Sequence, residues 1–293
     1  MYKGAYKMDT KHFFIISNQY KDPDGEISGK IKDYLESKGM ECTLWKPNPN
    51  IKNKKYLYTD ANDVPDDTDC IIALGGDGTI LQASRDLHYL KIPILGINIG
   101  TVGFLTDTDL DLANESLDRY ISGEYEIAKR MMIWGEIVRD GKIVYDNFAL
   151  NEAVINRSGG LKVIDFDIFV NNEFLNTYFA DGVIITTATG STAYSLSAGG
   201  PIIKPNGKMM MITPICPHTL NSRSIILDPD DEIVIEITDK KKVGEGKEIT
   251  FDGETSFKLE TGDKIYIRRF PEEALFIKTN KISFLQRIRQ CFV

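Results

Sequence analysis

The chain has 293 residues, 42% of them hydrophobic, a formal net charge of −8 and four cysteines without CxxC spacing. The length favours two domains, and the hydrophobic content excludes a disordered protein. The acidic balance argues against non-specific binding to nucleic acid, which relies on clustered Lys and Arg, and the cysteine spacing indicates neither a disulfide framework nor a zinc site.

The first part of the chain alternates strand and helix patterns. Residues 13–16 form an apolar run typical of a strand, and residues 26–38 carry apolar side chains at helical spacing before Gly39. Strands are also expected at residues 42–45, 70–74 and 92–97, and helices from about residue 80 and at 109–122. Strands that alternate with helices favour a parallel sheet with both faces covered.

From about Arg130 the pattern changes to short strands separated by turn signals, such as Asp140-Gly141, Asn171-Asn172 and Asp252-Gly253. This spacing predicts a β-rich second domain. Residues 282–290 are amphipathic and predict a final short helix. No apolar run is long enough for a signal peptide or a membrane span, so we expect a soluble, cytoplasmic protein.

The turn Gly75-Gly76-Asp77-Gly78-Thr79 separates a predicted buried strand from a predicted helix. Glycines in such a turn let backbone N–H groups approach a ligand, most often a phosphate. The carboxylate of Asp77 would repel phosphate unless a cation or a reacting hydroxyl lay between them. The turn matches neither a P-loop nor a dinucleotide fingerprint. A tight strand–helix connection with Asp77 as the helix cap is the alternative.

A second cluster of glycines and hydroxyl side chains occupies residues 186–201, shortly after Asp181. These residues could surround a polar ligand with hydrogen-bond donors, and Tyr194 could stack on a flat base. A structural loop with capped turns is the alternative.

Two further segments carry polar or exposed features next to predicted strands. Asn151-Glu152 interrupts an apolar run, and Glu152 could accept from two ribose hydroxyls, although a solvent-facing edge strand explains the pair as well. Residues 100–106 follow a predicted strand at the end where open α/β sheets bind ligands. Phe104 in that segment could line a base pocket or serve only in hydrophobic packing.

These motifs, in this order, resemble those of the NAD kinase family. The family's GGDGT turn, Asn-Glu pair and GSTAY segment are similar to Gly75–Thr79, Asn151-Glu152 and Gly190–Pro201, the last including the trailing Ser and Gly-Gly-Pro. Residues 214–220 and 284–289 also resemble family segments, so the similarity runs from about residue 12 to 293. The GGDGT turn alone is shared with diacylglycerol and sphingosine kinases, whereas the combination is more specific.

The resemblance implies phosphorylation of the 2′-hydroxyl of the adenosine ribose of NAD by ATP. Asp77 would be the general base, and Mg²⁺ or another divalent cation would accompany ATP, with no side chain predicted as a metal ligand. Nucleotide binding would fall to the other matched positions, which are Gly75, Gly76, Gly78, Thr79, Phe104, Asn151, Glu152, Lys162, Asp181, Thr189, Thr192, Ala193, Tyr194, Ser195, Leu196 and Ser197. Gln286 stands where many relatives carry His.

The implied fold is a Rossmann-like α/β domain with a mostly parallel sheet (1–129), followed by an all-β sandwich that binds NAD (130–270). Residues 271–293 would pack back on the first domain. The family also implies a homodimer or homotetramer, with no nucleic-acid or membrane partner. A lipid or other small-hydroxyl kinase of the GGDGT superfamily and a non-catalytic dinucleotide sensor are the alternatives. Whether ATP or polyphosphate is the donor, and NAD or NADH the acceptor, stays open.

Overall fold

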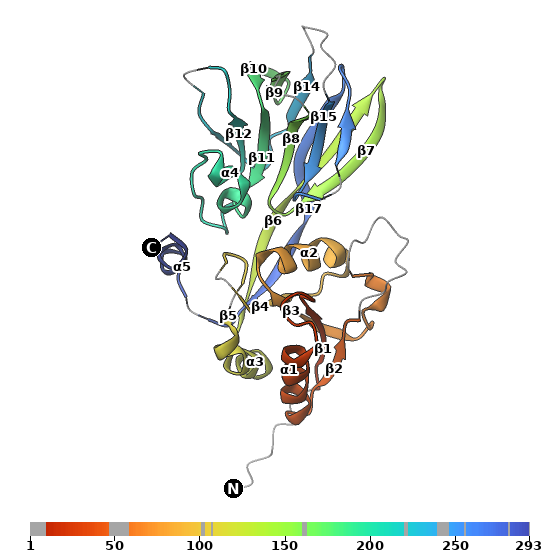
Figure 1. Cartoon of the computed structure of the whole chain (residues 1–293), viewed down its shortest axis with the longest axis vertical. Helices are drawn as coiled ribbons and strands as arrows, with labels where there is room; N and C mark the ends of the chain where they lie inside the picture. The colour runs from red at the N-terminus through yellow and green to blue at the C-terminus, as the bar shows by residue number, and fades with distance from the viewer. Residues whose placement is uncertain are drawn as a thin grey trace. The chain divides into compact units, whose positions relative to one another are not determined.

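The computed structural model describes residues 10–46, 59–100, 103–106, 108–159, 163–219, 222–238, 246–254, 256–280 and 282–292. The chain divides into two compact units. One unit comprises Met1–Lys129 together with Ala274–Val293, and the other comprises Arg130–Glu273 (Figure 1). Each unit is described by itself below.

The first unit contains a parallel sheet with the strand order β2-β1-β3-β4. These strands are β1 (His12–Ser17), β2 (Glu41–Leu44), β3 (Thr68–Gly75) and β4 (Ile94–Asn98). The short β5 (Thr108–Asp109) and the end of β17 (Lys264–Lys278) also pair in parallel with β4. β4 is buried along its whole length, as expected for a strand covered on both faces.

Helices cover both faces of this sheet (Figure 1). α1 (Glu26–Ser37) and α3 (Ala113–Ser122) pack on one face with the alternating strand residues Phe13 and Ile15. α2 (Asp77–Leu87) lies on the other face, where Gly96 leaves room for Ile80. The single-turn 3₁₀ helices are η1 (Ala61–Asp63), η2 (His88–Leu90) and η3 (Leu110–Leu112), and the terminal helix is α5 (Phe284–Phe292).

The predicted strands and helices of this unit are present, with one difference in extent. The helix expected at residues 109–122 begins only at Ala113. Asp109 instead pairs with Asn98 in the sheet, and the 3₁₀ turn Leu110–Leu112 then leads into α3. The apolar pattern continues through this turn, so it does not reveal the change of backbone conformation.

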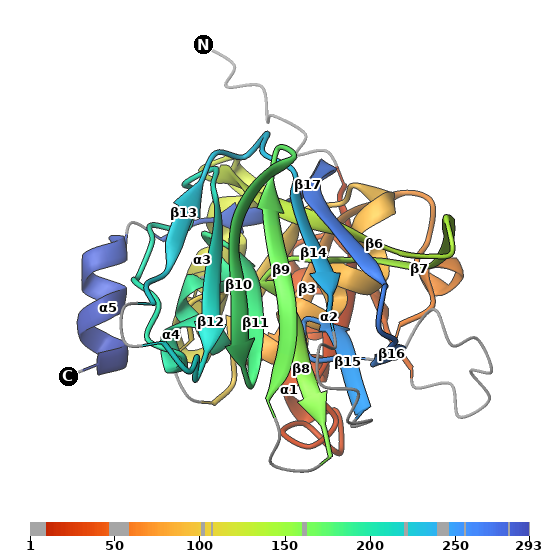
Figure 2. The ribbon, with the colours of Figure 1, turned by 90° about the horizontal axis from the view of Figure 1, so that it is seen from above.

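The second unit consists of two sheets. One has the antiparallel order β13 (Ile225–Leu227), β12 (Met210–Ile215), β11 (Gly182–Thr187), β8 (Glu152–Ser158), β15 (Gly246–Phe251) and β16 (Phe257–Leu259). The other contains β10 (Glu173–Ala180), β9 (Ile164–Val170), β14 (Ile233–Ile237), β17, β6 (Glu126–Arg139) and β7 (Lys142–Ala149). The order β10-β9-β14-β17 can be followed in Figure 2.

Side chains from both sheets form one core in the second unit. It contains Ile155 and Ile185 from one sheet and Phe166 and Ile265 from the other, all fully or almost fully buried. Two sheets that share a core in this way form a β-sandwich. The expected all-β fold of this part of the chain is confirmed.

The three predicted turn pairs have the backbone that their residue types favour. Asp140-Gly141, Asn171-Asn172 and Asp252-Gly253 all have positive φ at both positions. Asp, Asn and Gly adopt this left-handed conformation more readily than other residues, which is why such pairs mark tight turns.

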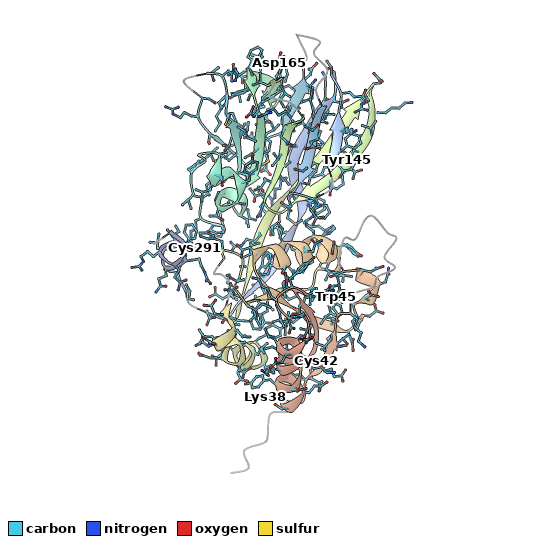
Figure 3. The ribbon with its side chains drawn as sticks, viewed as in Figure 1. Lys38, Cys42, Trp45, Tyr145, Asp165 and Cys291 are labelled. Atoms are coloured by element: carbon cyan, nitrogen blue, oxygen red, sulfur yellow. The ribbon has the colours of Figure 1, made fainter. Side chains whose placement is uncertain are left out.

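The four cysteines are free, and Cys42 and Cys291 can be seen in Figure 3. Trp45, also labelled there, directly follows β2. Within the part of the chain that the structure describes, no helix is long and apolar enough to cross a membrane.

Candidate active site

The Gly75–Thr79 turn connects the end of β3 to the start of α2. Gly76 is the residue before the helix and has an extended backbone, whereas Asp77 is the first helical residue. Gly75 has no room for a side chain, because a Cβ would collide with the side chain of Thr79. Apart from its own helix and its chain neighbours, no atom of the described residues lies within 4 Å of a Cβ position on Gly78, so the N-terminus of α2 is open toward them. This is the open, positive end of a helix dipole, which favours anions.

The carboxylate of Asp77 binds the segment that follows β4. It accepts hydrogen bonds from the backbone N–H groups of Phe104 (2.8 Å) and Leu105 (2.9 Å). Gly103 is required for this approach, since a Cβ there would collide with the carboxylate. The turn and the predicted Phe104 segment therefore lie together. The alternative in which Asp77 caps α2 is wrong, because Gly76 is the capping residue and no side chain caps this helix.

Lys21 is a basic neighbour of this turn that sequence reasoning missed. It lies in the loop after β1, and its ammonium nitrogen is 3.6 Å from the position of a Cβ on Gly76. The same nitrogen occupies the space where a Cβ on Gly100 would lie. Asn18 holds this loop in place, because its amide donates to Thr79 Oγ1 (3.1 Å) and its carbonyl accepts from the Lys21 N–H (3.3 Å). β1 and β3 are adjacent parallel strands, so the loops at their carboxyl ends are neighbours.

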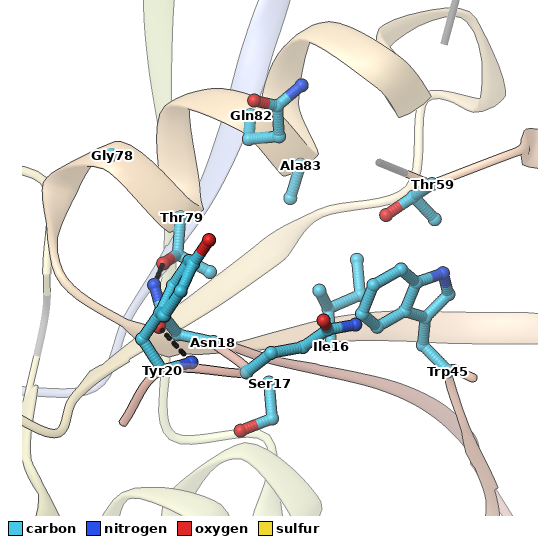
Figure 4. A pocket seen from close by; sticks show the side chains of 11 residues that line it. Ile16, Ser17, Asn18, Tyr20, Trp45, Thr59, Gly78, Thr79, Gln82 and Ala83 are labelled. Carbon is cyan, nitrogen blue, oxygen red and sulfur yellow. Dashed lines mark hydrogen bonds between the residues drawn. The ribbon is translucent and has the colours of Figure 1, made fainter. Parts of the chain in front are cut away.

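A cavity of about 340 Å³ lies beside the turn, within the same unit (Figure 4). The end of β1 and the loop after it, Trp45 after β2, and Thr59 line it together with the first turns of α2. The lining residues are Ile16, Ser17, Asn18, Gln19, Tyr20, Trp45, Thr59, Gly78, Thr79, Gln82 and Ala83.

In the second unit, Asp252 fixes the backbone around Asn151-Glu152. Its carboxylate accepts from the N–H groups of Leu150 (2.8 Å), Asn151 (2.8 Å) and Glu152 (3.0 Å). From the other side, Thr186 Oγ1 donates to the Asn151 carbonyl (2.9 Å) and Thr187 Oγ1 to the Leu150 carbonyl (2.6 Å). The main chain is thus fully engaged, which leaves the side chains of Asn151 and Glu152 as the groups available to a ligand.

The Glu152 side chain is buried, with 7% of the residue exposed. Its Oε2 has no hydrogen-bond partner among the residues that the structure describes. Burial, and secondarily the nearby Asp252 carboxylate, raise the pKa of Glu152 to about 8. A buried carboxyl oxygen without a partner is unfavourable, so it favours a ligand that donates a hydrogen bond to it.

The Gly190–Ser197 segment packs directly on Asn151. Gly190 is required there, because a Cβ would collide with the Asn151 carbonyl and Thr186 Oγ1. The structure therefore brings two of the predicted motifs together within one unit. The segment forms the 3₁₀ turn η4 (Gly190–Thr192) and the single helical turn α4 (Tyr194–Ser197).

The predicted hydroxyl side chains of this segment differ in what they face. The Ser195 hydroxyl is fully buried beside Thr213 (3.2 Å), and Thr189 is also buried. Thr192, Ala193 and Leu196 are half-buried, Thr192 Oγ1 donating back to the Thr189 carbonyl (3.3 Å). Tyr194 and Ser197 are exposed and free to meet a ligand. The hydroxyls of Thr192 and Ser195 bond within the protein, as a purely structural loop would require, whereas Tyr194 and Ser197 do not fit that alternative.

The sequence matches two domain families along most of its length. Residues 25–125 match the ATP-NAD kinase N-terminal domain, and residues 150–279 match the ATP-NAD kinase C-terminal domain. The chain belongs to the NAD kinase family. The resemblance that the three motifs indicated is therefore confirmed.

Relatives in this family match the chain from end to end. The NAD kinase of Lachnospira eligens is 51% identical over 289 residues, covering 95% of this chain and 99% of the relative. That of Lachnoclostridium phytofermentans is 41% identical, covering 96% and 99%. Among solved structures, yeast NADH kinase complexed with NADH superposes with a TM-score of 0.80 at 26% identity, covering 96% of this chain and 86% of that one. An NAD kinase from Archaeoglobus fulgidus, in complex with ATP, shares the fold with a TM-score of 0.74 at 24% identity, covering 95% and 99%.

Three further residues that the NAD kinase resemblance singled out remain to be placed, namely Asp181, Gln286 and Lys162. Asp181 is ion-paired with Arg157, whose Nε donates to it at 2.8 Å. Gln286 accepts from the Ser283 N–H (2.7 Å) while Ser283 Oγ accepts from the Gln286 N–H (3.2 Å), a reciprocal cap on the first turn of α5. Lys162 lies outside the described residues.

Proposed function

We propose that this chain transfers the γ-phosphoryl group of ATP to the 2′-hydroxyl of the adenosine ribose of NAD, giving NADP and ADP. The match to both NAD kinase domains and to full-length NAD kinases supports this proposal. The observation that carries it is the Gly75–Thr79 turn, in which an open helix N-terminus and a backbone-anchored carboxylate are adjacent. The open helix N-terminus suits a phosphate, and the carboxylate suits a reacting hydroxyl.

Asp77 would accept the proton of the attacking hydroxyl as its oxygen bonds to the γ-phosphorus and the bond to ADP breaks. The N–H groups of Phe104 and Leu105 fix the direction of the carboxylate without neutralising it, since both are uncharged donors. General-base assistance of this kind contributes about 10²–10⁴-fold to a rate. Positioning and charge compensation by the turn supply the rest of a phosphoryl transfer.

The turn fits a divalent cation that arrives with the nucleotide. Mg²⁺ keeps several waters and is held by one or two carboxylates together with substrate phosphates, and Asp77 is a carboxylate at this turn. The group of metal-ligating side chains found among the described residues, His12, Glu41 and Asp67, lies elsewhere, and both nitrogens of His12 are already hydrogen-bonded. When bound, the cation would compensate the charge of the phosphates.

The second unit would bind the acceptor. Glu152 would accept from ribose hydroxyls through its unpartnered Oε2, and Asn151 would orient the same sugar. The exposed ring of Tyr194 would stack on a base, with Ser197 beside it on the same helical turn. The remaining positions of the predicted set are proposed to bind nucleotide as the resemblance implies, with the buried Ser195 hydroxyl, which faces Thr213, supporting the segment from behind.

The Asp77→Asn variant tests this function. NADP formation from NAD and ATP should fall by about 10²–10⁴-fold, because an amide cannot take the proton. Binding of NAD should remain measurable, and the melting temperature should stay within a few degrees of the parent. Asp263→Asn is the control, because Asp263 is a buried carboxylate of the second unit that, among the described residues, accepts from Arg139 and the Glu260 N–H. Full activity of Asp77→Asn would remove this residue from the chemistry, and lipid phosphorylation without NADP formation would overturn the proposed function.

Three finer proposals follow, and the same assay tests the first of them. NADH is offered as acceptor beside NAD, because the yeast structure holds NADH. We further propose that the chain acts in the cytoplasm as a homodimer or homotetramer. Light scattering of the purified chain distinguishes these states from a monomer, and fractionation of cells tests the location.

A further inference from the structure

The cavity beside the glycine turn has no role in the function proposed so far. Two of its lining residues, Gly78 and Thr79, belong to the turn itself. The others come from the end of β1 and the loop after it, from Trp45 directly after β2, from Thr59 and from α2. Sites for small molecules occupy about 300–1,000 Å³, so a cavity of about 340 Å³ suits a nucleoside rather than a whole dinucleotide.

Thr59 offers this cavity a buried hydroxyl. The residue is 1% exposed, and its backbone N–H is fixed by the Asp86 carboxylate at 2.9 Å. Its Oγ1 has no hydrogen-bond partner within the described part of the chain, and Figure 4 shows this oxygen pointing toward the middle of the pocket. A buried hydroxyl without a partner is unfavourable in an empty protein and becomes favourable when a polar ligand supplies the partner.

Two aromatic side chains stand at opposite ends of the pocket in Figure 4. Trp45 closes one end and Tyr20 stands at the other, where 97% of it is exposed. A fully exposed aromatic ring at the rim of a cavity is a surface on which a flat ring can stack. Asn18 and Gln82 also line the pocket, with the Asn18 side chain bound to Thr79 and the Lys21 N–H and the Gln82 amide nitrogen donating to Asp86 (3.3 Å). This combination of flat apolar surfaces with a few polar groups is typical of a purine site.

Lys21 extends the site from the pocket toward Asp77. Its ammonium nitrogen lies beside Gly76, the residue before Asp77, and beside Gly100, while Gly78 and Thr79 of the same turn line the cavity. A nucleotide with its base in the cavity would therefore carry its phosphates past Lys21 toward Asp77. The cavity, Lys21 and Asp77 would then meet the base, the phosphates and the reacting phosphorus of the donor, in that order.

We propose that this cavity binds the base and ribose of the phosphoryl donor, a purine nucleoside triphosphate, and that Lys21 binds the donor's phosphates. The identity of the donor rests on the proposed function, whereas the binding site does not. The proposal favours ATP over polyphosphate as the donor, because polyphosphate reaches Lys21 but has no group to fill the cavity.

Binding measurements in the absence of any acceptor test this directly. The probes are Mg-ADP, which has a base, and tripolyphosphate, which has none, titrated calorimetrically into the full-length chain. Thr59→Val and Tyr20→Ala should each weaken Mg-ADP binding by about 3- to 10-fold, the loss expected for one neutral hydrogen bond or one stacked ring, and leave tripolyphosphate unchanged. Lys21→Ala should weaken both ligands by about 10-fold or more, as expected for a charged contact.

Matched controls separate these effects from damage to the fold. Thr68→Val also removes a buried, unpartnered threonine hydroxyl of the described chain but lies outside the cavity, and Lys30→Ala removes an exposed lysine of α1. Both controls should bind Mg-ADP like the parent. If Thr59→Val and Tyr20→Ala bind Mg-ADP normally, or weaken NAD instead, the nucleoside site is wrong. If Thr59→Val and Tyr20→Ala weaken Mg-ADP binding but the parent forms no NADP from NAD and ATP, the nucleoside site is supported and the proposed function is wrong.

Discussion

Glu152 is buried by the fold without a hydrogen-bond partner for its Oε2 among the described residues. Its backbone N–H, in contrast, is bound to the Asp252 carboxylate, and this negative charge and the burial both disfavour ionisation of Glu152. Such an arrangement lowers stability and is retained where a ligand uses the group. Ribose hydroxyls would donate to the oxygen and so favour its charged form.

The Glu152→Gln variant should change how stability depends on pH. The native pKa of Glu152 is raised to about 8 from an unfolded value of about 4.5, so its contribution is complete below pH 4.5 and is lost as pH rises to about 8. Glutamine does not titrate. The variant should therefore gain stability relative to the parent between pH 5 and pH 8.5, by at most about 5 kcal/mol.

Urea unfolding at the two pH values measures this difference. The chain has two tryptophans, and in a Trp45→Phe background the fluorescence of Trp134 reports on the second unit. Glu173→Gln, at an exposed position at the start of β10, is the control and should show the same pH dependence as the parent. An equal dependence for Glu152→Gln would mean that Glu152 is ionised in the native state at neutral pH.

At the scale of elements, Gly75 and Gly78 of the glycine turn are glycines for different reasons. Gly75 is required by the protein, because a Cβ would collide with Thr79 at the end of β3. Gly78, in the first turn of α2, has neither a positive φ nor a neighbour within 4 Å of a Cβ. Nothing in the described fold explains a glycine there, whereas a ligand that approaches the N-terminus of α2 does.

The variants Gly75→Ala and Gly78→Ala should therefore separate stability from activity. Gly78→Ala should leave the free energy of unfolding unchanged or raise it by up to about 1 kcal/mol, since alanine favours a helix, yet raise the KM for ATP by 10-fold or more. Gly75→Ala should lower stability by about 1–3 kcal/mol through overpacking. Thermal unfolding and steady-state kinetics on both proteins measure this, and normal kinetics in Gly78→Ala would show that no ligand approaches that residue.

Local features of the elements could be predicted from the sequence, and contacts between distant segments could not. The glycine turn and the pairs Asp140-Gly141 and Asn171-Asn172 depend on neighbouring residues alone, and the structure has them as expected. The roles of Lys21 and Asp252 could not be predicted, because strand pairing between distant segments brings these residues to the motifs. β1 beside β3 brings Lys21 to the glycine turn, and β15 beside β8 brings Asp252 to Asn151-Glu152. Asp252 had been recognised only as a turn residue.

At the scale of the whole molecule, the first unit is built from both ends of the chain. β17 pairs with β14 through its first half and with β4 through its last residues, so one strand serves both units. Residues from Ala274 onward then belong to the unit formed by the first 129 residues. Strand and helix patterns carry no information on such a return, and only the family resemblance indicated it.

This return predicts that the first unit depends on the end of the chain. Phe276 and Ile277 are 3% and 1% exposed, and the Thr279 carbonyl accepts from Arg119 of α3 at 2.8 Å. Burial of each of these two side chains stabilises by about 1.5–3 kcal/mol, against a total stability of about 5–15 kcal/mol for a domain. α5 is largely exposed, and its contacts include a buried hydrogen bond from Arg287 to the Thr106 carbonyl (3.1 Å).

A chain that ends at Glu273 should therefore lose the first unit, whereas a chain that ends at Asn280 should keep it. Hydrogen exchange of the β3 and β4 amides measures this, because these buried strands exchange only when the unit opens. The shorter chain should lose most of this protection while the β8 and β11 amides of the second unit retain theirs. The longer chain retains the strand end and the Arg119 contact and should differ little from the parent. Full protection of β4 in the shorter chain would show that the first 129 residues form a complete core without this strand.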